Sequence, residues 1–113
     1  MTIPCTLRPA AIVAIAVLTT AATSSAKHLA FRIAAHASVQ HSISIGMNDD
    51  LLVVEGDGST DLDCWVYDAR GVLADLDTDS TDYCILETPG LGMHRLVIRN
   101  YGDNANYYAV RKR

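Results

Sequence analysis

The feature that most constrains the fold is a recurrence of short strand-like patterns, separated by turn signals about every ten residues from position 41 onward. Within these segments apolar residues, many of them β-branched, alternate with polar ones, as in strands that bury one face. The turns are rich in glycine and aspartate, which accept positive φ or bond nearby amides. The predicted strands cover 41–46, 51–55, 62–68, 72–76, 83–87, 93–99 and 106–111. Seven or eight short strands at roughly this spacing predict an all-β chain folded as an antiparallel β-sandwich.

Segment 27–39 has the one ambiguous pattern. Its alanines and leucine favour a helix, whereas Leu29, Phe31 and Ile33 alternate with smaller or charged residues as in a strand. We favour a strand for part of the segment, because everything that follows is predicted to be β.

Segment 62–68 (LDCWVYD) has the clearest strand pattern. Alternate residues would point toward the core: Leu62, Cys64 and Val66. Trp65 and Tyr67 would lie on the opposite face and are candidate binding residues, because exposed tryptophan and tyrosine suit a peptide or a sugar ring. The alternative is that the N-terminal segment or another subunit covers this face, which would make both aromatics part of a core.

The first 26 residues have the three-part layout of a secretory signal peptide. A short segment containing Arg8 precedes an unbroken apolar run at 10–18, and small residues then lead to a cleavage site after Ala26 or, alternatively, after Ala22. The run is too short for a membrane-spanning helix, which needs about 20 residues. We therefore expect export of a single domain, residues 27–113, to the periplasm or the extracellular medium.

The cysteine content also suits an exported chain. Cys5 leaves with the signal peptide, and Cys64 and Cys84 remain. An even pair in an oxidising compartment predicts one disulfide, and closing a loop of this length would stabilise the fold by about 3 kcal/mol. Two buried free thiols on neighbouring strands are the alternative.

Charge is distributed unevenly along the chain. All 13 acidic residues lie at or after Asp49, and Arg70 is the one cation between Asp49 and Asp82. The dominant field is therefore negative and would repel phosphate, so nucleic acid is not an expected partner.

The order of several segments resembles the bacterial pre-peptidase C-terminal domain family: GDGSTDLDCWVYDARG, DTDSTDYC, the turn TPG, LVIRNYG and a final NYYAV. The similarity extends over 43–111. Members of that family are small, jelly-roll-like β-sandwiches of exported bacterial proteins, often found behind secreted peptidases. The resemblance implies a non-catalytic accessory or binding module, although here no peptidase domain stands before it.

Several aspartates in and beside the turns are candidate calcium ligands: Asp57, Asp61, Asp63, Asp75, Asp77, Asp79 and Asp82. Calcium binds six to eight oxygen atoms, which closely spaced loop carboxylates can supply. The segment is not an EF-hand, because Ser80 and Leu86 stand where that loop requires glycine and glutamate. Related collagen-binding modules of clostridial collagenases use calcium, but their ligands have no residue-by-residue match here. The alternative is that the aspartates cap turns, pair with arginines and keep the protein soluble.

The sequence does not predict an enzyme. No two of its histidines have a close metal-ligand spacing, and there is no nucleophile elbow of the type G-x-S-x-G. His94 is expected to point inward as a hydrogen-bonded core residue. If Cys64 and Cys84 are bonded to each other, no thiolate nucleophile is left.

The function predicted from the sequence is an exported, non-catalytic binding or accessory module that recognises a protein or carbohydrate partner. Two alternatives stay open: a calcium-binding structural or adhesion module, and a small partner or inhibitor of an exported peptidase.

Overall fold

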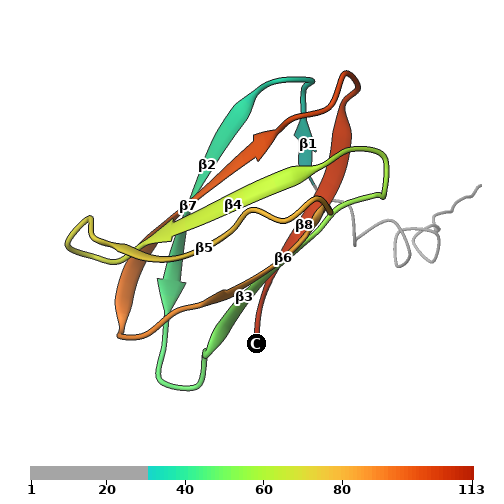
Figure 1. Ribbon diagram of the computed structural model, residues 1–113. Helices are drawn as coiled ribbons and strands as arrows, with labels where there is room; N and C mark the ends of the chain where they lie inside the picture. The colour runs from blue at the N-terminus through green and yellow to red at the C-terminus, as the bar shows by residue number, and fades with distance from the viewer. Residues whose placement is uncertain (1–30) are drawn as a thin grey trace, which may run out of the picture.

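The computed structural model describes residues 31–113, which form eight strands and no helix (Figure 1). The predicted signal peptide and positions 27–30 lie outside the described residues. The strands are β1 (Phe31–Ile33), β2 (Ser38–Ile45), β3 (Leu51–Glu55), β4 (Leu62–Tyr67), β5 (Leu73–Asp77), β6 (Tyr83–Glu87), β7 (Gly92–Asn100) and β8 (Asn106–Lys112). Residues 31–113 include no helix with the length and hydropathy to span a membrane.

The strands form two four-stranded sheets in which every pairing is antiparallel. The first sheet has the order β1-β8-β3-β6 and the second β2-β7-β4-β5. Apart from the β4–β5 hairpin, consecutive strands lie in different sheets, so the chain crosses repeatedly between the two layers (Figure 1). This is the connectivity of a jelly roll. The predicted antiparallel, jelly-roll-like β-sandwich is confirmed.

The core lies between the two sheets and consists of the inward residue of each alternating pair. Every strand except the edge strand β5 contributes a buried residue to it, and its main members are Ile33, Ile45, Leu52, Val54, Leu62, Val66, Leu86, Leu96, Ile98 and Tyr108. In β4 the three residues predicted to point inward are fully buried. Burying one such aliphatic side chain contributes roughly 1.5–3 kcal/mol, which explains why the period-2 pattern determines the faces of these strands.

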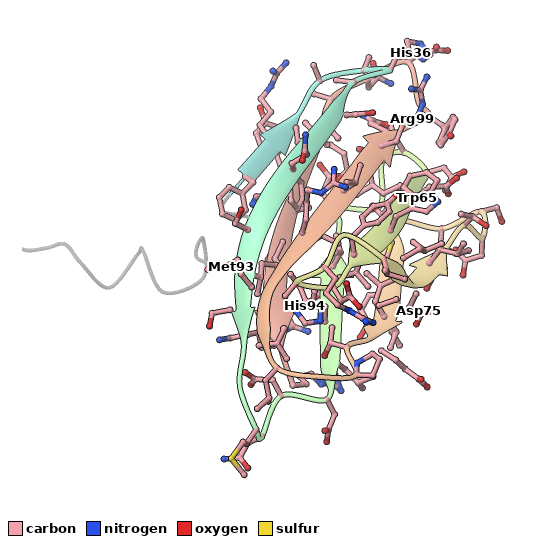
Figure 2. The ribbon with its side chains drawn as sticks, turned by 90° about the vertical axis from the view of Figure 1, so that its left-hand side faces the viewer. His36, Trp65, Asp75, Met93, His94 and Arg99 are labelled. Atoms are coloured by element: carbon pink, nitrogen blue, oxygen red, sulfur yellow. A yellow bond between two sulfur atoms is a disulfide. The ribbon has the colours of Figure 1, made fainter. Side chains whose placement is uncertain are left out.

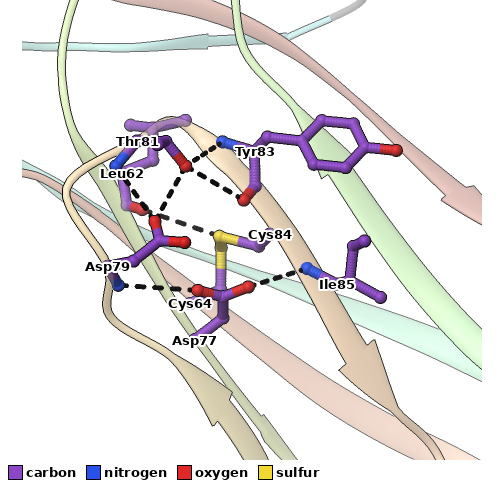
Figure 3. The surroundings of a disulfide bond; sticks show 8 residues. All are labelled: Leu62, Cys64, Asp77, Asp79, Thr81, Tyr83, Cys84 and Ile85. Atoms are coloured by element: carbon purple, nitrogen blue, oxygen red, sulfur yellow. Dashed lines mark hydrogen bonds between the residues drawn. A yellow bond between two sulfur atoms is a disulfide. The ribbon is translucent and has the colours of Figure 1, made fainter.

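The predicted disulfide joins the two sheets. Cys64 on β4 and Cys84 on β6 are both fully buried, and their Cα atoms are 6.3 Å apart (Figure 3). The bond closes a loop with a sequence separation of 20 and ties the second sheet to the first through the core. Its position explains why the small sandwich can do without a larger hydrophobic core.

The N-terminal part of the fold differs from the prediction in its boundaries. Segment 27–39 is not one strand over its described part, because β1 ends at Ile33 and a tight turn follows. His36 in this turn has a positive φ of 59°, and the Ala37 amide donates to the Ala34 carbonyl oxygen at 3.1 Å. β2 then begins at Ser38, three residues before the predicted start, since Val39 continues the inward pattern of Ile43 and Ile45.

The turn between β4 and β5 also shifts one boundary. Val72 was predicted as the first residue of a strand, but β5 begins at Leu73. The Asp68 carboxylate accepts hydrogen bonds from the amides of Arg70 and Val72, at 2.9 and 3.0 Å, and so holds Val72 in the turn. Short polar side chains often compete with the strand ladder in this way.

Two fully buried asparagines fix the loops at one end of the sandwich. Asn100, at the end of β7, donates from Nδ2 to backbone carbonyl oxygens of the β1–β2 and β7–β8 loops and accepts from the Gly102 amide. Asn106, at the start of β8, donates to Thr60 and to the Asp82 carboxylate and accepts from the Asp57 amide. The loops that carry the aspartates are therefore anchored by hydrogen bonds in the interior.

Candidate binding face and acidic loops

The outer face of the second sheet carries Trp65 and Tyr67, as predicted from the alternation in β4. Both are half-buried, whereas Val66 between them points into the core. Strand register puts Val97 of β7 and Leu76 of β5 on either side of Trp65, and Arg95 beside Tyr67. Three of the four strands therefore contribute to one surface, which we call the aromatic–arginine face (Trp65, Tyr67, Arg95, Arg99, Tyr101, Leu73, Leu76, Val97 and Met93). Figure 2 labels Trp65, Met93 and Arg99.

Two arginines on this face lie over tyrosine rings. The Arg95 guanidinium carbon is 4.4 Å from the centroid of the Tyr67 ring, and Arg95 also donates to Gln40 Oε1 at 3.3 Å. Arg99 lies over Tyr101 at 4.9 Å. Each contact holds a long cationic side chain in one position in the unbound protein. Binding a partner would therefore cost less side-chain conformational entropy than it would with two freely moving arginines.

Exposed aliphatic side chains flank the aromatic and arginine residues. Leu73 and Leu76 are 45 % exposed and Met93 is 55 % exposed. No segment within residues 31–113 covers the face. These residues therefore give no support to the predicted alternative, in which the face is covered and its aromatics belong to a core. Exposed apolar residues gathered around Trp, Tyr and Arg are typical of a protein-binding surface.

The aspartates serve several different local structures. Asp57 and Asp82 hold the turn between β3 and β4. Asp57 accepts from the Ser59 amide and hydroxyl and from the Tyr107 amide, while Asp82 accepts from the Gly58 amide at 2.7 Å. Burial opposes ionisation of Asp57, but the hydrogen bonds from Ser59 and Tyr107 outweigh it and hold its pKa below the ordinary value.

Asp75 and Asp77 connect the edges of the two sheets. Their side chains leave β5 toward β6, where Asp75 Oδ2 accepts from the Glu87 amide at 2.7 Å. Asp77 Oδ2 accepts from the Ile85 amide at 3.0 Å (Figure 3). These amides point away from β3 and would otherwise lack a partner in the ladder. We call this pair of contacts the carboxylate seal, because it closes the β5–β6 side of the sandwich.

Asp79 caps the loop after β5. Its carboxylate accepts from the hydroxyl of Thr81 at 2.8 Å and from the Thr81 amide at 3.0 Å (Figure 3). These two hydrogen bonds lower the pKa of Asp79. Of the predicted calcium ligands, Asp57, Asp75, Asp77, Asp79 and Asp82 therefore all accept hydrogen bonds from backbone amides.

Asp61 and Asp63 differ from the other aspartates. Each has a buried Oδ1 atom without a hydrogen-bond partner among the described residues. Burial and the charges of Asp79 and Asp82 raise the pKa of Asp61, and burial together with the charges of Asp61, Asp77 and Asp79 raises that of Asp63. Even so, no three acidic, histidine or cysteine side chains of residues 31–113 converge closely enough to share a metal ion.

The described histidines make separate contacts. His94 is buried, as predicted, and its Nδ1 bonds the Gly92 carbonyl oxygen at 3.0 Å. His41 bonds Tyr108 through Nε2 at 2.6 Å, and His36 contacts Asp103 on the surface. Burial lowers the pKa of His41 and raises that of Tyr108 to about 12.

Sequence reasoning found the two β4 aromatics but missed the rest of the face. Arg95 and Arg99 alternate with buried residues of β7 and so lie opposite the core, yet nothing in a single sequence indicates that β7 lies beside β4. The available signal was local: both arginines alternate with buried residues, as the aromatics do.

Comparison with known proteins gives no further assignment of the face or of the acidic loops. No protein-family model matches the chain, and no curated protein matches it either. The resemblance to the pre-peptidase C-terminal domain family therefore stays a prediction from the sequence.

Proposed function

We propose that this protein is an exported, non-catalytic binding module and that its aromatic–arginine face binds an exported protein. The observation that carries the proposal is the stacking of Arg95 on Tyr67 beside Trp65, with Leu76 exposed next to them. Tryptophan, tyrosine and arginine supply most of the binding energy in protein interfaces. Export rests on the predicted signal peptide.

A protein fits this face better than a carbohydrate does. Sugar rings bind by stacking on an open aromatic face, but the guanidinium groups of Arg95 and Arg99 already lie over the rings of Tyr67 and Tyr101. The flanking leucines and Met93 offer apolar area that suits side chains rather than hydroxyl-rich sugars. The fixed guanidinium groups would favour a partner that presents carboxylates to them.

The test is affinity capture followed by a binding measurement with purified components. Chain 27–113 is immobilised and exposed to the exported fraction of the source cells, and the captured protein is then titrated against Trp65→Ala and Arg95→Ala. Tyr107→Ala is the matched control, because Tyr107 is exposed on the outer face of the first sheet.

We expect each face variant to weaken binding at least about tenfold while the control binds as wild type. Equal binding by all variants would remove the face from the proposal. Retention of polysaccharide that depends on Trp65 would favour the carbohydrate alternative instead. If the captured protein is a peptidase, its activity in the complex decides whether the module acts as an inhibitor.

Calcium binding is a second candidate function, favoured by one specific observation. Asp61 and Asp63 each have a buried oxygen without a hydrogen-bond partner in residues 31–113, and neighbouring carboxylates help to raise their pKa values, a combination that a cation would relieve. The remaining aspartates already accept amide hydrogen bonds, which supports their alternative role as turn formers. Thermal unfolding with calcium and with a chelator separates these two roles.

A further inference from the structure

The two long sides of the sandwich differ in how their strand edges are satisfied. On the β5–β6 side, the carboxylate seal occupies the outward amides of β6. On the opposite side lie β2, at the edge of the second sheet, and the short β1, at the edge of the first. Between them the described residues leave a surface groove of about 300 Å³, lined by Phe31, His41, Ser42, Ile43, Val110 and Lys112.

Within residues 31–113, strand β2 has a long edge without a neighbouring strand, and the hydrogen-bonding groups of that edge can be assigned from the pairing of β2 with β7. The Asn100 amide donates to the Ala37 carbonyl oxygen, so residues 37, 39, 41, 43 and 45 direct their backbone groups toward β7. The intervening residues direct theirs away from the sheet: Ser38, Gln40, Ser42 and Ser44. One of these groups is occupied, since Lys112 Nζ donates to the Ser44 carbonyl oxygen at 2.9 Å.

The β2 edge lacks the usual protection against strand addition over the rest of its length. Its eight residues, SVQHSISI, include no proline, lysine, arginine or acidic residue, and its register with β7 has no bulge. Other edges of the described sandwich are protected: β6 by carboxylates, β5 by a bulge against β4, and β1 by its short length of three residues. Edges without such features readily pair with another strand.

We propose that β2 pairs antiparallel with β2 of a second copy, which joins the two second sheets into one continuous sheet across a two-fold axis. The chain has a net charge of −4, but β2 carries no acidic or basic side chain other than His41. Two copies can therefore meet along this strand. Its outer-face side chains are also small or neutral, so the strands can approach without repulsion between like charges.

One register satisfies the geometry over the whole strand. Ser38 pairs with Ser44 of the partner subunit, and Gln40 pairs with Ser42 of the partner subunit. In this register each residue with outward backbone groups meets another such residue, as an antiparallel ladder requires. His41 then lies at the two-fold axis, where its imidazole points between the sheets of its own subunit toward Tyr108.

The association state of chain 27–113 tests the proposal by sedimentation equilibrium, with charge placed on the outer side of β2. Ser42→Lys and Gln40→Glu each put like charges near one another across the axis. We expect a dimer for the wild type and an association at least about tenfold weaker for each variant alone. An equimolar mixture of the two variants should associate more tightly than either alone, because each lysine then faces a glutamate of the other chain.

Two further variants keep the result interpretable. Ser80→Lys makes the same charge change in an exposed loop on the sealed side and should dimerise as wild type does. Lys112→Gln frees the Ser44 carbonyl oxygen and should tighten the dimer. A wild-type monomer up to millimolar concentration would overturn the proposal, and so would equal dimerisation of Ser42→Lys and Ser80→Lys. A dimer that dissociates only in Trp65→Ala would overturn it too, since the aromatic–arginine face would then be the subunit interface.

Discussion

Removing the carboxylates of the seal tests how the β5–β6 side of the sandwich is held. Asp77→Ala removes the acceptor of the Ile85 amide, and Asp75→Ala removes the acceptor of the Glu87 amide. Both residues of β6 have exposed side chains, so water can replace the lost acceptor and no buried group is left unsatisfied. The effect of each substitution should therefore be local.

The expected magnitude follows from the type of hydrogen bond. A hydrogen bond to a charged acceptor contributes about 1.5–3 kcal/mol to stability in a favourable setting. Because solvent weakens partly exposed bonds, we expect each of these two bonds to contribute about 1.4 kcal/mol. That free energy corresponds to about a tenfold change in the local opening equilibrium. It also corresponds to a fall in Tm of about 4–8 °C per kcal/mol for a domain of this size.

Amide hydrogen exchange measured by NMR resolves the two bonds separately. In Asp77→Ala the Ile85 amide should exchange about tenfold faster with little change at Glu87, and in Asp75→Ala the pattern should reverse. Asp103→Ala is the control, because its carboxylate contacts only the exposed His36 among the described residues. If both amides already exchange freely in the wild type, or if each variant speeds both equally, the seal does not exist as described.

Three further predictions concern the core, the acidic loops and the disulfide. Because burial lowers the pKa of His41 below its ordinary value of 6.5, the unfolded chain takes up a proton at a higher pH than the folded protein does. Stability should therefore be full well above pH 6.5 and should fall as the pH drops through that value; thermal unfolding should show a weaker fall in His41→Gln. Asp63→Asn should stabilise the protein at pH 7 by about 0.5 kcal/mol, because it removes a partly buried negative charge that neighbouring carboxylates repel. If calcium binds at Asp63, the Tm of the wild type should rise with calcium, and the Tm of this variant should not. The double variant Cys64→Ser, Cys84→Ser should lose about 3 kcal/mol relative to the oxidised wild type, measured by denaturant unfolding, and the reduced wild type should show a similar loss. Equal stability of the oxidised and reduced wild type would contradict the role given to the bond.

The fold was predictable where one physical rule acts along the chain. In β4 and β7 the alternation of apolar and polar residues identifies the buried face without any knowledge of neighbouring strands. The disulfide was predictable from the predicted signal peptide and the cysteine count, although not the fact that it joins opposite sheets. Boundaries were less predictable, since the turns at His36 and Asp68 depend on backbone conformation and on side chains that bond locally.

The candidate sites were harder to predict, because they depend on which strands become neighbours. Arg95 lies beside Tyr67 only because β7 sits next to β4, a pairing that joins segments far apart in the sequence. Likewise, Asp75 and Asp77 belong to a loop-like acidic run in the sequence, yet they bond a strand of the other sheet. The composition of the segment identifies these aspartates as one group, whereas the strand topology gives their carboxylates different hydrogen-bond partners.

The carboxylate seal also limits how large an assembly of this protein can grow. A sheet that adds strands at both ends can propagate into a filament, because every added copy offers a new end. Here the β5 end of the second sheet faces β6, whose outward amides are already occupied, so β2 is the one long end open to growth among the described strands. Pairing through β2 uses that end in both copies at once, and growth stops at two.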